Sequence, residues 1–440
     1  MSGTRLRWAW ALLVVCDLLL LGEVQPSAAQ ANVDYGNEQS LAELLWERAA
    51  EVIEARAAIR QGESAYERAR LYPNPTLDAA WSTIPVGRTN PPGLSDRLDR
   101  IPNYSASLSE LFEIGKRGPR IAARSFDVQR LRAEAEAILG DRFFALLEAI
   151  GQIAANQRRR DVLDEQLRDG EELLELDRAR ASRGEIPALD VDVAEVEQAR
   201  LRALRDSAEA DLRRAQADCS RLLALTCPEF QTDDAAGDFL ARVYRPAAAS
   251  RYPVEAALER RPDVRALRLA ISAAAQDAQL AARRVVPDVT VRAGYTYDPF
   301  VVSGNQRNSL ALGVEVPIPA FDRGQADLLA ARAAESRARE ALRVLVEGLP
   351  AQLQVAQAQL ELALRRMNEL DRAIAKARTM RDALVEAQHA GGISAIEVLV
   401  ARRNYQDLLR ERVGADADAF SAAVNIRKLT GVFPTVPKKE

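Results

Sequence analysis

The side chains that could carry catalysis are few and scattered along the chain. The only histidine among the 440 residues is His389, so neither a histidine-based catalytic triad nor a multi-histidine zinc site can be assembled. The tripeptide GKR at 115–117 lacks the upstream glycine and the following Ser or Thr of a nucleotide-binding loop. The sequence therefore predicts a protein that is not an enzyme and that uses no cofactor and no metal site of its own.

Two carboxylates remain as candidates for chemistry because each follows a glycine-containing turn at an equivalent position. Asp190 lies in RGEIPALDV (183–191), and Glu397 lies in AGGISAIEV (390–398). One explanation is that an acid at a helix start is favoured by the helix dipole. The other is that such carboxylates cluster in an assembly, where they favour cations over anions and can bind a divalent ion.

The two cysteines that follow the first 30 residues are Cys219 and Cys227. Residues 1–29 have the pattern of an export signal, because basic residues precede a short apolar run and small residues offer cleavage near Ala29. The run is shorter than the ~20 residues of a spanning helix, and lipidation at Cys16 is an alternative. In an oxidising compartment the cysteine pair either forms a disulfide or remains two buried thiols.

The composition favours long helices over a thick globular core. The chain is 48% hydrophobic but only 5% aromatic, and 28% of its residues are charged. The formal net charge is −4 with both signs interspersed. The absence of a long basic run in the sequence gives no indication of a nucleic-acid partner.

Three landmarks recur in the same order and at a nearly constant offset, which predicts a duplication. RLYPNPTLDAAW (70–81) aligns with RVVPDVTVRAGY (284–295), KRG (116–118) aligns with DRG (322–324), and the two glycine-containing turns align with each other. The predicted division is a first repeat, a linker, a second repeat and a tail, at 30–226, 227–252, 253–430 and 431–440.

Each repeat is predicted to contain a helical stretch, two strands, a long helix and a returning helix. The strands are expected at about 75–84, 104–113, 289–297 and 309–318. Their apolar residues alternate with polar or small ones, so one face meets an apolar phase and the other meets water. Runs of about ten residues suit a tilted membrane strand, although an ordinary hairpin fits equally well.

The helical stretches are expected at 40–71 and 254–284, with a fresh start at Pro262. The long helix of the first repeat should run from 119 to 183, which is about 100 Å at ~1.5 Å per residue. Apolar residues recur in it every three or four positions, as in a coiled-coil seam. Its counterpart spans 325–389, and Gly140 and Pro350 are candidate kinks. The returning helices are expected at 186–225 and 393–429.

Over nearly all of its length after the signal, the chain resembles the TolC-like outer-membrane efflux proteins. The resemblance rests on YPNPTL (72–77), RRPDVRAL (260–267), EIGKRGPRIAAR (113–124) and the two turns. The third of these segments is most similar to the branch that exports heavy metals, of the cobalt-zinc-cadmium type.

The resemblance implies a homotrimer in the outer membrane of a Gram-negative bacterium. Four strands per chain cannot close a barrel, and open edges in lipid leave unpaired backbone groups. Three chains would give a twelve-stranded β-barrel that continues into a periplasmic coiled-coil tunnel. The junction at Lys116, Arg117 and Arg120 would lie at the polar boundary of the membrane. The irregular stretch after Pro228 and the tail after Gly431 would pack around the middle of the tunnel.

The two turns would form periplasmic tips that dock on an adaptor protein, and exposed apolar residues there are well explained by a partner. The residues concerned are Gly184, Ile186, Pro187, Ala188, Leu189, Gly391, Gly392, Ile393, Ser394 and Ile396. Threefold symmetry would bring three copies of Asp190 and of Glu397 to a periplasmic gate. One turn further on, Val400 stands where the family has another acid.

The resemblance implies a channel of a tripartite exporter that works with an adaptor and an inner-membrane pump of the resistance-nodulation-division type. The expected cargo is heavy-metal cations. An alternative within export is a drug-efflux or type I secretion channel. An alternative from another class is a soluble periplasmic coiled-coil scaffold in which the strands are ordinary hairpins.

Overall fold

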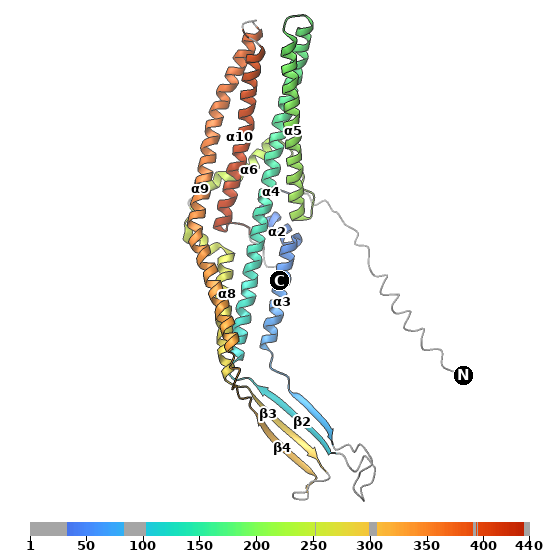
Figure 1. Cartoon of the computed structure of the whole chain (residues 1–440), viewed down its shortest axis with the longest axis vertical. Helices are drawn as coiled ribbons and strands as arrows, with labels where there is room; N and C mark the ends of the chain where they lie inside the picture. Colours follow the sequence, from blue (N-terminus) through green and yellow to red (C-terminus); the bar gives the residue numbers. More distant parts are fainter. Residues whose placement is uncertain are drawn as a thin grey trace, which may run out of the picture.

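The computed structural model describes residues 33–82, 103–250, 252–298, 306–389, 393 and 395–434. A four-stranded antiparallel sheet lies at one end of an elongated bundle of helices (Figure 1). Its strands are β1 (Thr76–Ser82), β2 (Asn103–Phe112), β3 (Val289–Tyr297) and β4 (Asn308–Glu315), and they are paired in this order. The prediction of a mainly helical chain with four strands is confirmed.

Two very long helices leave the sheet and run to the opposite end of the molecule (Figure 1). These are α4 (Arg117–Ser182) and α9 (Gln325–His389), with 66 and 65 residues. Each remains one helix through its candidate kink, Gly140 or Pro350. The helices α5 (Ala188–Leu223) and α10 (Ala395–Thr430) return along them and form two helical hairpins. No helix within the described part of the chain is long and apolar enough to cross a membrane.

Shorter helices complete the half of the bundle next to the sheet. They are α2 (Glu38–Arg48), α3 (Ala50–Arg70), α7 (Val254–Arg260) and α8 (Pro262–Ala282), and the 3₁₀ turn Arg283–Val285 follows α8. Pro262 is the first residue of α8, as predicted. The helix expected over 40–71 is divided instead, because Ala49 has extended backbone angles.

Two other predictions are wrong in detail. The stretch after Pro228 was expected to be irregular, but α6 (Asp233–Ala249) begins within it. The Thr232 hydroxyl accepts a hydrogen bond from the Ala235 N–H at 3.1 Å and caps the helix, and Phe239 and Leu240 are buried on its inner face. The last strand ends at Glu315, so Val316 and Ile318 lie beyond it, because Pro317 cannot donate to the ladder.

The main core lies at mid-height, where the two hairpins meet α2 and α6. Phe143 of α4 and Phe420 of α10 are fully buried there, and the ring centroids of Phe239 and Phe420 are 5.7 Å apart. Phe433 of the C-terminal segment packs edge-on against Phe144, with centroids 6.0 Å apart. The rest of the bundle is thin, and its helices have large exposed faces.

Helices and strands follow one order across the molecule. Next to the sheet, α3, α4, α8 and α9 lie side by side in this order, each contacting the next. Toward the far end the order is α5, α4, α10 and α9. Apart from α2, α6 and α7, which pack against these helices, the described part of the chain is therefore a wall one layer thick, with β1, α3 and α5 at one edge and β4 and α9 at the other (Figure 1).

Candidate functional site

The sheet has one apolar face and one polar or small face. Leu77, Leu108, Ala293 and Leu312 are paired across the four strands and form one apolar row. Their sequence neighbours Asp78, Ser107, Gly294 and Ala311 form the next row. Because side chains alternate along a strand, the two rows point to opposite sides. Leu312 is 86% exposed, so the apolar face has no cover within the described chain.

Aromatic side chains gather on the apolar face at the end of the sheet far from the helices. The rings of Trp81 and Tyr104 are stacked with centroids 6.0 Å apart, and those of Tyr104 and Tyr297 are 6.4 Å apart. Such rings favour the boundary between hydrocarbon and water, because they combine an apolar body with a polar group. The arrangement matches an outward-facing apolar band with an aromatic girdle.

The basic junction between β2 and α4 has a structural role that its sequence did not reveal. Arg117 donates to the carbonyl oxygen of Arg70 at 2.8 Å, and Arg120 donates to those of Ala69 and Leu71 at 3.1 and 3.4 Å. These carbonyls end α3 and have no partner within their own helix. The two arginines therefore cap α3 from the first turn of α4.

The same junction is fastened to the second half of the chain. Lys116 forms an ion pair with Asp288 at 2.8 Å, and the N–H of Ile114 donates to the same carboxylate at 3.2 Å. Asp288 precedes β3 directly. Since both side chains of the ion pair are largely buried, it fixes how strands from the two halves meet the helices.

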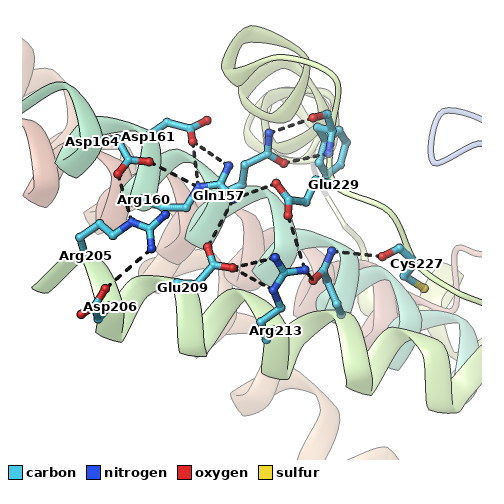
Figure 2. A network of polar contacts seen from close by, with 12 residues as sticks. Gln157, Arg160, Asp161, Asp164, Arg205, Asp206, Glu209, Arg213, Cys227 and Glu229 are labelled. Carbon is cyan, nitrogen blue, oxygen red and sulfur yellow. Dashed lines mark hydrogen bonds and ion pairs between the residues drawn. The ribbon is translucent and has the colours of Figure 1, made fainter. Parts of the chain in front are cut away.

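At mid-height, a polar network holds the segment after α5 against α4 (Figure 2). Arg160 forms ion pairs with Asp161 at 2.8 Å and with Glu229 at 2.9 Å. Burial alone would lower the pKa of Arg160, but hydrogen bonds and charges from these two acids outweigh it and raise the pKa. Gln157 exchanges two hydrogen bonds with the backbone of Phe230, at 2.8 and 2.9 Å.

The candidate disulfide lies beside this network. Cys219 and Cys227 are bonded, with Cα atoms 6.1 Å apart, and both are almost fully buried. The bond closes a tight loop in which Ala224 has a φ of 51°. The bond fixes the start of the next segment, in which Glu229 and Phe230 form hydrogen bonds with Arg160 and Gln157 of α4.

The first hairpin turn has the positive φ at its glycine and the exposed apolar residues that its sequence predicts. Gly184 has a φ of 75°, a backbone conformation that other residues rarely adopt, and its N–H donates to the carbonyl oxygen of Ala181 at 2.9 Å. Ile186 is half-buried, whereas Pro187, Ala188 and Leu189 are exposed. Leu189 is 65% exposed, so an apolar tip faces outward from the end of the bundle.

The second turn is described only in part. Gly391, Gly392 and Ser394 lie outside the described residues, as do the side chains of His389 and Ile396. Ile393 is half-buried. The two predicted gate acids are equivalent in position, because Asp190 lies in the first turn of α5 and Glu397 in the first turn of α10. Within the described ranges, no group of three or more His, Cys, Asp or Glu side chains could hold a metal ion.

Comparison with known proteins connects these features to one family. The family model described as outer membrane efflux protein matches residues 254–432. The chain is also similar to the cobalt-zinc-cadmium resistance protein CzcC of Cupriavidus metallidurans, with 24% identity over 84% of each chain. Residues 254–432 of the chain thus match the outer membrane efflux protein family.

Solved structures agree with this protein in fold over most of its length. CusC matches with a TM-score of 0.74 and 15% identity, over 89% of this chain and 91% of CusC. VceC of Vibrio cholerae matches with a TM-score of 0.71 and 19% identity, over 89% and 95%. The outer-membrane channel OprN matches with a TM-score of 0.69 and 18% identity, over 89% of both chains.

The match to this family indicates the location and the general role. An outer membrane efflux protein is a channel and not an enzyme, and it lies in the outer membrane of a Gram-negative bacterium with a large periplasmic part. It works with an adaptor and an inner-membrane pump. The sequence indicated the strands and the glycine-containing turn at Gly184, but it did not reveal that Arg117 and Arg120 cap α3.

Proposed function

We propose that this outer membrane efflux protein is a homotrimer that exports heavy-metal cations through a twelve-stranded barrel and a helical tunnel. The observation that carries the proposal is the pair of free edges of the one-layer wall. In lipid, the unpaired backbone groups of β1 and β4 would each cost several kcal/mol. Pairing β4 of one copy with β1 of the next satisfies both edges, and three four-stranded sheets supply twelve strands.

The helical edges support the same assembly. Val344, Val355 and Leu362 on α9 are 62, 57 and 61% exposed, and Val196 on α5 is 70% exposed. The two edges belong to different helices, so a contact between them is head-to-tail, and such contacts form a ring when the rotation between copies closes. The small and polar face of the sheet, with Asp78, Arg292 and Glu315, would then line the channel.

Three features bear on cargo and partners. The relative CzcC is named for resistance to cobalt, zinc and cadmium. Threefold symmetry would bring three Asp190 and three Glu397 carboxylates together near the tips, where they would favour cations. The exposed turn at Leu189 would dock on the periplasmic adaptor, which in turn would connect to a pump of the resistance-nodulation-division type. Fold similarity to several channels does not by itself distinguish metal export from drug export or secretion.

Growth of a deletion strain tests the cargo. Without this gene, cells should become sensitive to cobalt, zinc or cadmium but not to a panel of drugs, and the wild-type gene should restore growth. The variant L189D should assemble in the outer membrane without restoring resistance, because a charge at the tip disrupts an apolar contact. The matched variant R183Q, which changes an exposed charge of the same turn, should restore it. Sensitivity to drugs alone would contradict the proposed cargo.

A further inference from the structure

A small cavity with both polar and apolar lining lies between the two helical hairpins, between mid-height and the tips. Its volume is about 60 Å³, and α4, α5, α9 and α10 line it. Its lining includes the polar side chains of Gln166, Glu197, Gln198 and Arg402, together with Gly170. Glu197 and Gln198 are 6% and 4% exposed, so they are buried although they are polar.

Three polar atoms at this cavity have no hydrogen-bond partner among the residues that the structure describes. They are Nε of Arg402, Oε1 of Glu197 and Oε1 of Gln198. A buried polar group left unpaired costs about 1–3 kcal/mol, and more if it is charged. Three such atoms around one cavity therefore indicate that the cavity is filled by something that bonds to all of them.

The surrounding polar groups are already used by direct bonds between the hairpins. The second carboxylate oxygen of Glu197 is bonded to Arg403. Gln166 donates to the carbonyl oxygen of Gln406 at 3.3 Å and accepts from Arg410 at 3.1 Å. These bonds hold α10 against α4 and α5 around the cavity. Near the three atoms, Nε of Arg200 lies 3.8 Å from Oε1 of Glu197, too far for a hydrogen bond.

The three atoms together need one acceptor and two donors. A chloride ion would serve Arg402 but would face the carboxylate of Glu197, and a metal cation would serve the two oxygens but would face the guanidinium. Water donates two hydrogen bonds and accepts two. A cavity of about 60 Å³ is large enough for more than one water, since each needs ~10–15 Å³ of this volume.

We propose that this cavity is a water site through which Arg402 of one hairpin is bridged to Glu197 and Gln198 of the other. Burial, and next the charge of Arg381, lower the pKa of Arg402, which agrees with a guanidinium that lacks a direct carboxylate partner. Burial also raises the pKa of Asp177 on the facing helix. Bridging water would hydrogen-bond to the Arg402 guanidinium and the Asp177 carboxyl group without bringing the two side chains into contact.

The cavity in the contact between the two hairpins lies next to an apolar cluster. Nearer mid-height, Leu163 of α4 and Leu201 and Ala208 of α5 form a small apolar cluster. Beyond it, toward the tips, the polar groups of Gln166, Glu197 and Arg402 interrupt an apolar contact that includes Leu173 and Val398. If the proposed function holds and the tips must open, the hairpins separate at this water site while the core at mid-height stays closed.

A structure at a resolution that shows water tests the site directly, without any transport assay. We expect density within ~2.7–3.2 Å of Arg402 Nε and Glu197 Oε1, and no anomalous signal there after bromide soaking. An empty cavity, a direct bond between these side chains or a bromide peak would overturn the proposal. None of these results would alter the assignment of the protein as a channel.

Two variants test whether water in the cavity, and not a general change of the fold, stabilises the contact between the hairpins. A Cβ on Gly170 would lie 1.8 Å from Nε2 of Gln198, so G170A should push the amide into the cavity and displace the water, whereas G414A meets nothing within 4 Å. Amide exchange in α10 around Arg402 should be at least tenfold faster in G170A than in G414A. If G170A does not fold, Q198M, which removes one acceptor without a clash, should show the same direction of change. Equal exchange in the variant and its control would overturn the proposal.

Discussion

The Nε atom of Arg120, in the first turn of α4, donates to the carbonyl oxygen of Ala69 in the last turn of α3, at 3.1 Å. The same guanidinium reaches the carbonyl of Leu71 and forms an ion pair with Glu113. One side chain thus ends a helix of the bundle and fixes the end of a strand of the sheet. This explains why a basic residue is needed where the wall passes from strands to helices.

The variant R120M should destabilise the protein by about 2–3 kcal/mol, because it leaves two carbonyls and a carboxylate unpaired. R120K should recover only part of this loss, since an ammonium cannot reach all three acceptors in the geometry of a guanidinium. Thermal unfolding of the purified protein measures both. R132M is the control, because the Arg132–Glu63 pair is about half exposed on both sides and should contribute less than ~1 kcal/mol. Equal losses in R120M and R132M would refute the capping role.

The two faces of β4 should respond oppositely to a charge. L312R places an arginine on the apolar face and should cost about 2–4 kcal/mol near the middle of the membrane. It should therefore reduce the amount of assembled protein in outer-membrane fractions. A311R, one residue earlier on the opposite face, should assemble normally and change the single-channel conductance instead. A reversal of the two phenotypes would mean that the sheet faces have been assigned the wrong way round.

Removing the disulfide should lower stability without changing the fold. The double variant C219S/C227S opens a loop whose ends are eight residues apart, and the loss should be about 2.5 kcal/mol by loop-closure entropy. Denaturant unfolding with and without a reductant measures it. Reductant should shift the midpoint of the wild type toward that of the variant and leave the variant unchanged. If the reductant leaves the denaturant midpoint of the wild type unchanged, the disulfide does not contribute to the free energy of unfolding.

The start of α8 should make stability depend on pH. Burial alone would raise the pKa of Asp263, but hydrogen bonds and charge from Arg261, at 2.6 and 3.0 Å, hold it below its ordinary value of 3.8. A lowered folded-state pKa means that the pair stabilises the protein above 3.8 and that this is lost as pH falls through the folded-state pKa. D263N should therefore be less stable than the wild type at neutral pH, and the difference should shrink in acid.

The control for this effect is D218N, because Asp218 is 55% exposed and its ion pair with Arg221 is 3.6 Å long. Its stability difference from the wild type should be small at every pH. A difference between D263N and the wild type that stays constant from neutral to acidic pH would exclude ionisation of Asp263 as the cause.

Regular patterns in the sequence predicted the parts of this fold that repeat. Alternation at Leu310, Leu312 and Val314 identified β4, and the absence of proline between 119 and 183 indicated one long helix, which the structure shows as α4. Period and length are local properties, so they can be recognised without knowing what packs against them. The end of β4 was misplaced because the alternation continues past the last paired residue.

Features that depend on distant segments were not predictable in this way. The helix α6 was missed because its first turn is acidic and polar, and its buried face has a partner only once α4 and α10 surround it. Arg120 and Ala69 are 51 residues apart, and Arg402 and Glu197 come from different halves of the chain. A charged residue in a sequence does not reveal which carbonyl or cavity it will face.

The central claim is that identical copies complete an open wall, and a cryo-electron microscopy structure of the detergent-extracted protein tests it most directly. We expect a ring of three chains in which β4 of each is hydrogen-bonded antiparallel to β1 of the next. A monomer with both edges unpaired, or a ring with another number of chains, would contradict it.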